Sequence, residues 1–307
     1  MGKVSLVSIS CLTFNHAPYL RKCFDSFLAQ KTDFEIEILV HDDASTDGTQ
    51  EIIQEYTEKY PGIFKPIIQK ENQYSQGVRG IAVRYNFARS KGKYIATCEG
   101  DDYWTDPLKL QKQVDFLEDN PNYSMCCTNY SEINSAGEII KEKGWGSTKS
   151  AKTITQEVIF KKYKPKILTS VFRKESVDFE FPKEFFESFN ADNFMCALAS
   201  NYGPIAYLNI ITGHYRVHNQ GIWSGKSKIR QFEMQLETFL KMKNVFLKKE
   251  QQLAIENRIY HIRRKLSRLY ILNKDFGKSF SLIHQLSKTN KIDSAKVFFG
   301  NLISIVR

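Results

Sequence analysis

Short runs of apolar, mostly β-branched residues alternate with segments of helical periodicity along residues 1–102. The runs predict β-strands at Val4–Leu12, Glu35–Val40, Phe64–Gln69 and Lys93–Cys98. Two of the intervening segments repeat apolar residues three and four positions apart, which predicts amphipathic helices at Ala17–Gln30 and Thr49–Tyr60. Strands that alternate with helices are typical of an α/β fold, in which a mostly parallel sheet carries helices on both faces. Ligands of such sheets bind beyond the carboxyl ends of the strands.

The pattern is less regular up to residue 225 and helical beyond it. The middle of the chain predicts helices at Leu108–Leu117 and Asp192–Ser200, strands at Ser124–Tyr130 and Pro204–Ile211, and Lys-rich loops over 135–166. From Ile229 onward the periodicity is helical almost to the last residue. We therefore expect an α/β domain at 1–225 and a basic helical C-terminal region at 226–307.

Charge separates these two parts of the chain. The sequence has 44 Lys and Arg against 34 Asp and Glu, a formal net charge of +10. Residues 1–225 hold 26 basic and 28 acidic residues, whereas 226–307 hold 18 and 6. A basic tail of this kind meets phosphates of lipid or nucleic acid, or it is a solvated helical surface. It has neither the aromatic pattern of RNA-recognition motifs nor zinc-finger spacing, so nucleic acid is not the expected partner.

Signals for membrane insertion or export are not found in the sequence. The chain has no apolar run of about 18 residues, and serines interrupt the apolar residues near its start. The six cysteines include no CxxC pair, which favours buried, reduced thiols. We expect a cytoplasmic protein.

Paired carboxylates follow two of the predicted strands. Asp42 and Asp43 come directly after the second strand, and Asp101 and Asp102 follow the fourth. Each pair alone could cap a helix or lie in a solvated turn. Together, at one edge of one sheet, they would repel each other without a cation, and such oxygen-rich clusters suit Mg²⁺ or Mn²⁺. Because neither a GxGxxG nor a GxxxxGK[ST] motif occurs, the sequence gives no support to a dinucleotide site or a P-loop.

Three segments together resemble a known family. They are Val7-Ser8-Ile9-Ser10-Cys11-Leu12-Thr13-Phe14-Asn15, Asp42-Asp43-Ala44-Ser45-Thr46-Asp47-Gly48-Thr49, and Gly92-Lys93-Tyr94-Ile95 leading to Glu99-Gly100-Asp101-Asp102-Tyr103-Trp104. In this combination the chain resembles glycosyltransferase family 2 over about residues 4–225. The resemblance implies the GT-A fold, a Rossmann-like sheet with helices on both faces. It also implies inverting transfer from nucleotide-diphosphate sugars, UDP-sugars first among them, often in bacterial surface-polysaccharide synthesis such as capsule or lipopolysaccharide.

The resemblance assigns roles to single residues. For the nucleotide sugar it implies Thr13, Asn15, Asp42, Asp43, Arg79 and Asp101, with Arg84 as the alternative to Arg79. For a divalent metal, Mg²⁺ or Mn²⁺, it implies Asp101, Asp102 and His218, whereas Glu99 stands where many family members carry Asp. Asp192 matches the catalytic base, with a helix N-cap as its structural alternative. Trp104 and Trp223 are sugar-stacking or core residues.

The expected function is therefore sugar transfer to a saccharide or a lipid-linked saccharide. The basic region 226–307 would place the protein peripherally at the inner face of the membrane by contacting anionic lipid, and its apolar stripes could mediate a homodimer. Two alternatives remain open: a sugar-phosphate nucleotidyltransferase, and a non-enzymatic nucleic-acid-binding or membrane-binding protein.

Overall fold

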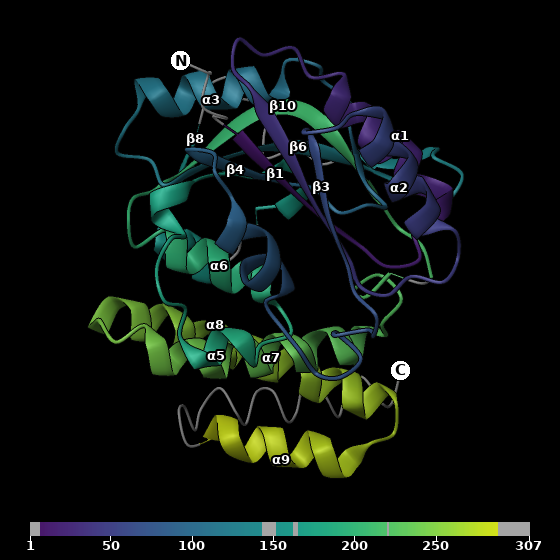
Figure 1. Cartoon of the computed structure of the whole chain (residues 1–307). Coiled ribbons are helices and arrows are strands. Elements are labelled where there is room, and N and C mark those ends of the chain that lie inside the picture. Colours follow the sequence, from purple (N-terminus) through teal and green to yellow (C-terminus); the bar gives the residue numbers. More distant parts are fainter. Residues whose placement is uncertain (1–6, 143–151, 162–164, 220, 288–307) are drawn as a thin grey trace.

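The first third of the chain forms an alternating series of strands and helices. The computed structural model describes residues 7–142, 152–161, 165–219 and 221–287 (Figure 1). Its first elements, in chain order, are β1 (Val7–Thr13), α1 (Ala17–Leu28), β2 (Ile36–Asp42), α2 (Thr49–Lys59), β3 (Phe64–Ile68), a π-helical and 3₁₀ segment (Ala82–Asn86 and Phe87–Arg89) and β4 (Tyr94–Thr97). All four predicted strands and both predicted helices are confirmed. The residues of the first strand before Val7 lie outside the described residues.

The second part adds shorter strands and the C-terminal helices. These elements are β5 (Tyr103–Trp104), α3 (Lys109–Asp119), β6 (Met125–Ile133), β7 (Ile139–Glu142), β8 (Lys152–Ile154), α4 (Gln156–Lys161), the 3₁₀ turn Ile167–Thr169, β9 (Val171–Arg173), α5 (Lys183–Phe186), α6 (Ala191–Ala199), β10 (Ile205–Arg216), α7 (Lys228–Val245), α8 (Lys249–Leu272) and α9 (Phe276–Ser287). The expectation of loops throughout 135–166 was wrong, because β7, β8 and α4 form there; residues 143–151 and 162–164 lie outside the described part.

One curled sheet runs through the molecule, in the order β3-β2-β1-β4-β9-β6-β10-β5. The strands β3, β2, β1 and β4 are parallel, and so are β6 and β10. The short strand β9 is antiparallel to both β4 and β6 and joins the two parallel groups. Because β1, β2 and β4 are parallel, their carboxyl ends meet at one edge.

Side chains of the sheet alternate between two hydrophobic cores. Tyr94 and Ala96 of β4 face a core shared with α1, α2 and α3, whereas Ile95 between them faces the opposite core. Alternation of this kind follows from the two-residue period of a strand. The serines of β1 follow the same rule: Ser8 bonds the buried carboxylate of Glu37 at 2.5 Å, and Ser10 accepts from Asn86. Helices therefore cover both faces, as the α/β prediction requires.

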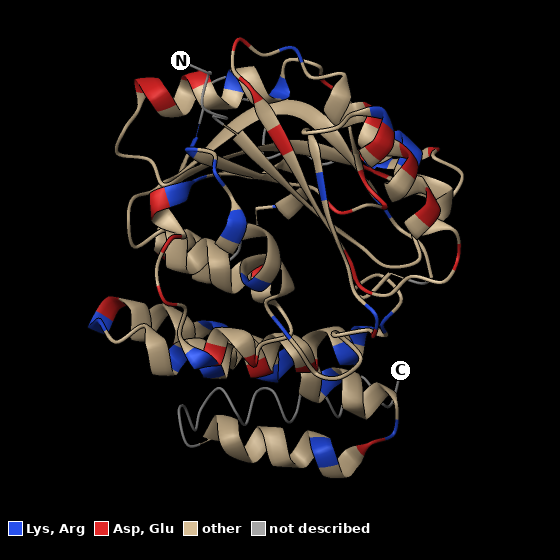
Figure 2. Ribbon diagram, viewed as in Figure 1, with Lys and Arg blue, Asp and Glu red and all other residues tan. Residues whose placement is uncertain are grey.

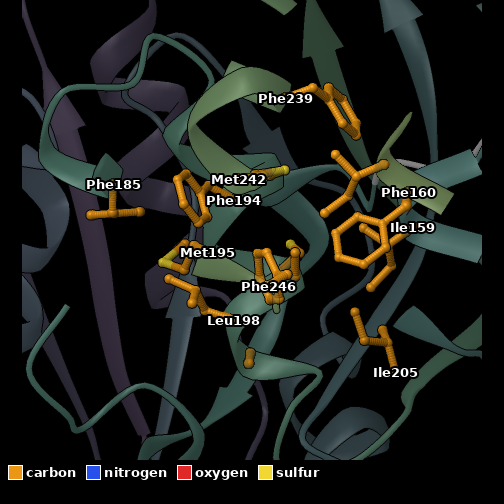
Figure 3. Close-up of a cluster of buried hydrophobic side chains, with 14 of the residues drawn as sticks. Ile159, Phe160, Phe185, Phe194, Met195, Leu198, Ile205, Phe239, Met242 and Phe246 are labelled. Carbon is orange, nitrogen blue, oxygen red and sulfur yellow. The ribbon is translucent and has the colours of Figure 1, made fainter. Parts of the chain in front are cut away.

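The C-terminal helices belong to the second core. Phe239 and Met242 of α7 pack with Phe160 of α4, Phe194 of α6 and Ile205 of β10, all buried (Figure 3). Ile255, Ile259 and Ile262 of α8 join the same cluster. Thus α7 and α8 share a core with the sheet, and the division at residue 225 stays a prediction.

Lys and Arg are prominent on the C-terminal helices. Blue residues recur along α7 and α8 below the sheet in Figure 2, whereas the segments around the sheet carry both signs of charge. The charge separation seen in the sequence therefore corresponds to a layer of the structure. Within the described ranges, each helix is too short or too polar to cross a lipid bilayer.

Candidate active site

A cavity of about 560 Å³ opens beyond the carboxyl ends of β1, β2 and β4. Segments far apart in the sequence line it, including the turn before α6 and the end of β10. The lining includes six of the nine residues that the sequence assigned to the nucleotide sugar, the metal or catalysis: Thr13, Asp43, Arg79, Asp101, Asp102 and Asp192. The place where parallel strands end therefore holds the largest share of the predicted site.

Asn15 and Asp42 serve the adjacent turn instead of lining this cavity. The Asn15 side chain accepts the Thr46 N–H at 2.8 Å, and Asn15 takes a left-handed backbone (φ 52°). The buried Asp42 carboxylate accepts from the backbone and hydroxyl of Ser45 and from Gln50 at 2.9 Å. Both residues thus hold the turn between β2 and α2 in shape, and their nucleotide-binding roles stay predictions.

Asp43 and Arg79 shape one wall of the cavity. The Asp43 carboxylate accepts the backbone N–H groups of Gln73 and Tyr74 at 2.8 and 3.0 Å, which holds that loop against the sheet. The Arg79 guanidinium lies 4.0 Å from the ring centre of Tyr74 and 5.0 Å from that of Phe189. Arg84, the alternative to Arg79, is exposed and lies outside the lining. The structure therefore brings Arg79, and not Arg84, into the cavity.

Glu99, Asp101 and Asp102 form a carboxylate cluster at the end of β4. Each offers an oxygen, and these oxygens lie within 4.8 Å of one another. One oxygen each of Asp101 (Oδ1) and Asp102 (Oδ2) is buried and lacks a hydrogen-bond partner among the described residues. Buried carboxylate oxygens are costly without a partner. Hard divalent cations take oxygen ligands, so this cluster fits Mg²⁺ or Mn²⁺.

Two histidines face the carboxylate of Asp101. Nε2 of His218 lies 3.0 Å from Oδ2 of Asp101, and Nε2 of His16 lies 3.8 Å from the same oxygen. Burial opposes ionisation of Asp101, but the His218 hydrogen bond and the His16 charge together hold its pKa below the usual range. His218 therefore contacts the cluster through the Asp101 carboxylate. Its role as a metal ligand stays a prediction.

Asp102 is held by the last residue of β10. Its Oδ1 accepts the Arg216 backbone N–H at 2.7 Å, and the Arg216 guanidinium bonds the carbonyls of Asp101, Asn134 and Ser135. Burial, followed by the charges of Asp101 and Glu99, raises the pKa of Asp102 well above its usual range. Burial and neighbouring carboxylates also raise the pKa of Glu99 to about 8. Repulsion of this kind is what a bound cation relieves.

Asp192 lies in the first turn of α6 and lines the cavity. The N-cap position of this helix belongs to Asn190, so the structural alternative for Asp192 does not hold. Of the two tryptophans singled out by sequence, Trp223 lines the cavity, whereas Trp104 is buried and donates its indole N–H to the Leu168 carbonyl at 2.7 Å. Trp104 is therefore a core residue.

Among the cavity residues that sequence reasoning missed are His16 and Lys166. His16 follows Asn15 directly, so its position after the first strand was a usable signal. Lys166 lies in a segment predicted as a Lys-rich loop, where nothing in the local pattern distinguishes it from its neighbours. Its side chain nevertheless lines the cavity, with the ammonium 3.2 Å from the ring centre of Tyr215.

Known proteins resemble this chain in sequence. An uncharacterized protein of Mycobacterium tuberculosis is 34% identical over 224 residues, which are 72% of this chain and 60% of that relative. The Escherichia coli UDP-Glc:α-D-GlcNAc-diphosphoundecaprenol β-1,3-glucosyltransferase WfaP is 35% identical over 115 residues, 38% of this chain and 42% of that enzyme. The chain thus spans about three-fifths of the length of the mycobacterial relative.

Solved structures share the fold. A Pyrobaculum calidifontis mannosyltransferase in complex with GDP-Man and Mn²⁺ superposes with a TM-score of 0.62 and 13% identity, covering 100% of this chain and 82% of that one. S. aureus TarS with UDP-GlcNAc gives 0.59 and 17%, covering 94% and 92%. These likenesses confirm the expected GT-A-type fold. The model of glycosyl transferase family 2 matches residues 8–187, more than half of the sequence, and the chain belongs to that family.

Proposed function

We propose that this protein is an inverting glycosyltransferase that moves a sugar from a nucleoside-diphosphate sugar, preferably a UDP-sugar, to a saccharide or lipid-linked saccharide. The observation that carries the proposal is the composition of one cavity. It contains a carboxylate cluster, two of whose buried oxygens have no hydrogen-bond partner in the described part of the chain, and, at the start of α6, the further carboxylate of Asp192. This reaction needs a site for a cation and, separate from it, a general base.

Asp101 and Asp102 would hold the metal, with Glu99 or His218 beside them. A bound Mg²⁺ or Mn²⁺ supplies neutralisation of the negative charge that develops on the leaving diphosphate. The backbone N–H of Arg216 and the imidazole of His218 keep the two carboxylates in place before the metal arrives. Preorganised ligands of this kind lose little conformational freedom on binding.

The chain's own chemistry would centre on Asp192. Its carboxylate accepts the proton of the acceptor hydroxyl, whose oxygen bonds to the anomeric carbon while the bond from that carbon to the diphosphate breaks. Attack from the face opposite the leaving group inverts the anomeric centre. The position of Asp192 on a helix with a buried face, next to Asn193 and Phe194, gives the base a fixed direction.

Donor recognition would fall to the wall formed by Thr13, Asp43 and Arg79. The solved relatives hold UDP, UDP-GlcNAc or GDP-Man, so the likeness supports a nucleotide-sugar donor without selecting the base. Asp43 would contribute by shaping this wall, because its carboxylate accepts hydrogen bonds from the backbone of Gln73 and Tyr74.

The acceptor would be lipid-linked and the protein peripheral at the inner membrane face. WfaP, by its name, uses a diphosphoundecaprenol-linked sugar, and the putatively named TuaG of Bacillus subtilis is assigned to teichuronic acid biosynthesis. Exposed basic residues on α8, such as Arg264 and Arg268, supply charge complementary to anionic lipid. A role in surface-polysaccharide synthesis follows from these observations together.

A panel of nucleotide sugars, each incubated with the protein and Mn²⁺, tests the function. Release of a nucleoside diphosphate from one donor, increased by a saccharide acceptor, is the expected result. Release of pyrophosphate from a nucleoside triphosphate would instead identify a nucleotidyltransferase. Binding of nucleic acid with no turnover of any donor would overturn the enzyme proposal.

A further inference from the structure

Lys166 is the one lysine among the described residues that line the cavity. Besides Lys166, the lining contains two arginines, and both use their guanidinium groups on backbone carbonyls: Arg79 on Tyr74 and Val78, and Arg216 on Asp101, Asn134 and Ser135. The Lys166 ammonium lies 3.2 Å from the ring centre of Tyr215 and 5.5 Å from that of Tyr130. Lys166 is therefore placed differently from the other cations.

The backbone around Lys166 is tied to the segment that carries the acidic cluster. Its carbonyl accepts from the backbone N–H of Thr169 at 3.0 Å, which starts the 3₁₀ turn Ile167–Thr169. Thr97, the last residue of β4, bonds this turn through its hydroxyl and donates its N–H to Ser170 at 3.1 Å. The indole of Trp104 donates to Leu168 on the same turn. The lysine and the carboxylates that follow β4 are thus fixed to one another.

Burial lowers the pKa of Lys166, and the carboxylates of Asp102, Glu99, Asp192 and Glu132, in decreasing order of effect, oppose this. Three of these carboxylates, those of Asp102, Glu99 and Asp192, line the same cavity as Lys166. The ammonium therefore shares one cavity with the proposed metal cluster and the proposed base. A fixed cation in this position attracts both groups of carboxylates and repels a second cation.

Building on the proposed function, we infer that Lys166 is a positioning residue that balances the charge of the two carboxylate groups: it orients Asp192 toward the acceptor and lowers the affinity of the cluster for the divalent cation. Its role makes two opposite predictions. Removing the ammonium impairs transfer, because Asp192 loses a positive charge within the same cavity, but tightens metal binding, because the carboxylates lose a competing cation. A residue that only supports the fold would weaken both.

Lys166→Met tests this, since Met keeps an unbranched apolar side chain against Tyr215. Mn²⁺ affinity is measured by calorimetry without substrate, together with turnover. We expect Mn²⁺ to bind about tenfold more tightly to Lys166→Met than to the wild type, from loss of one unit charge beside the site, and turnover to fall about tenfold or more. Lys166→Arg, which keeps the charge, should restore the wild-type Mn²⁺ affinity.

The control is Lys59→Met, because Lys59 also lies over a tyrosine ring, at 5.3 Å from the centre of Tyr60, but outside the cavity. It should change neither quantity. Equal or weaker Mn²⁺ binding by a folded Lys166→Met would overturn the inference. If the wild-type protein itself bound no Mn²⁺, the proposed metal site would be wrong. This result is distinguishable from failure of the Lys166 inference, in which the wild type binds Mn²⁺ and Lys166→Met binds it no more tightly. Circular dichroism and the melting temperature establish that each variant is folded.

Discussion

At the scale of single residues, the cavity combines groups with opposing electrostatic needs. The pKa of Asp101 is held below its usual range although burial opposes this, because two imidazoles face its Oδ2. The pKa of Asp102, the next residue along the chain, is raised because Asp102 is buried and lies near the carboxylates of Asp101 and Glu99. Neighbouring residues of identical chemistry therefore differ through their partners, which come from the N-cap of α1 and from the end of β10 and the residues after it.

The first residue-scale prediction concerns the base. Asp192→Asn removes the proton acceptor without changing the shape of the side chain, so turnover should fall about 10²–10⁴-fold while donor binding stays unchanged. Steady-state kinetics and calorimetry with the donor measure the two quantities. Asp178→Asn, which changes an exposed carboxylate outside the cavity, serves as the control. Full activity of Asp192→Asn would show that another group is the base.

The second residue-scale prediction concerns stability without metal. An acid whose pKa is raised by folding opposes folding at pH values above its unfolded pKa, so ionised Asp102 costs stability near neutral pH. Asp102→Asn should therefore raise the melting temperature of the metal-free protein, by about 2–4 °C for each kcal/mol regained.

The same variant should lose the stabilisation that Mn²⁺ gives the wild type, because binding to the folded state raises the melting temperature only where a site remains. Thermal melts in chelator and in Mn²⁺ measure both effects. A metal-free variant less stable than the wild type would mean that the Asp102 charge is already compensated.

At the scale of elements, α7 and α8 complete a core that the sheet and α6 leave open. Phe239, Ile259 and Ile262 are buried at 4% exposure or less in the same cluster as Phe194 and Ile205. A helix docked in this way is expected to unfold with the sheet, because its apolar face is buried in the core that both share. Removing residues 226–307 would therefore expose the core as well as remove charge.

A single core substitution tests this shared core. Ile262→Ala should destabilise the whole chain by about 2–5 kcal/mol through the cavity it leaves. The expected result in chemical denaturation is one transition, shifted as a whole. Leu253→Ala on the same helix is the control, because that leucine is 61% exposed and should cost little. Two separate transitions, of which only one moves, would instead indicate an independent C-terminal domain.

At the scale of the whole molecule, charge is arranged in layers. In the C-terminal region, the basic residues of described elements lie on helices below the sheet. These helices are on the side away from α1 and α2, which connect strands of the sheet (Figures 1 and 2). Part of this charge is paired between the helices, as in Lys243 of α7 with Glu256 of α8 at 2.7 Å. The exposed Arg264, Lys265 and Arg268 of α8 lie within about one turn of each other.

Membrane docking is best tested by substituting basic residues, because deletion of residues 226–307 would also expose the hydrophobic core. Each basic residue near an anionic bilayer contributes about 1 kcal/mol. Replacing Arg264, Lys265 and Arg268 together by Gln should therefore weaken binding to phosphatidylserine vesicles about 100-fold, as measured by sedimentation at low salt. Substituting Gln for three exposed lysines of the first part, Lys31, Lys59 and Lys91, removes the same charge elsewhere. Equal losses in both variants would indicate nonspecific attraction only.

The sequence by itself was sufficient for the alternation of strands and helices and for the acidic pairs at strand ends. Apolar periodicity is local, so β1, α1, β2 and α2 are readable from neighbours in the chain. Parallel strands bring their carboxyl ends to one edge, so the meeting of Thr13, Asp43 and Asp101 also follows from the pattern. The short strands β7 and β8 escaped prediction for different reasons. The four residues of β7 are all exposed, so no buried face marks the strand, and β8 pairs with β10, which is distant in sequence.

Only the tertiary structure decided which side chain points where. Asp42 turns to Ser45 and Gln50, whereas its neighbour Asp43 faces the cavity, and local sequence does not distinguish them. The placement of Lys166 depends on a turn bonded to β4 and Trp104. Contacts of this kind join residues tens of positions apart, and their geometry exists only once the sheet has formed. Site chemistry was therefore visible in the sequence as residue types, and the structure assigned their partners.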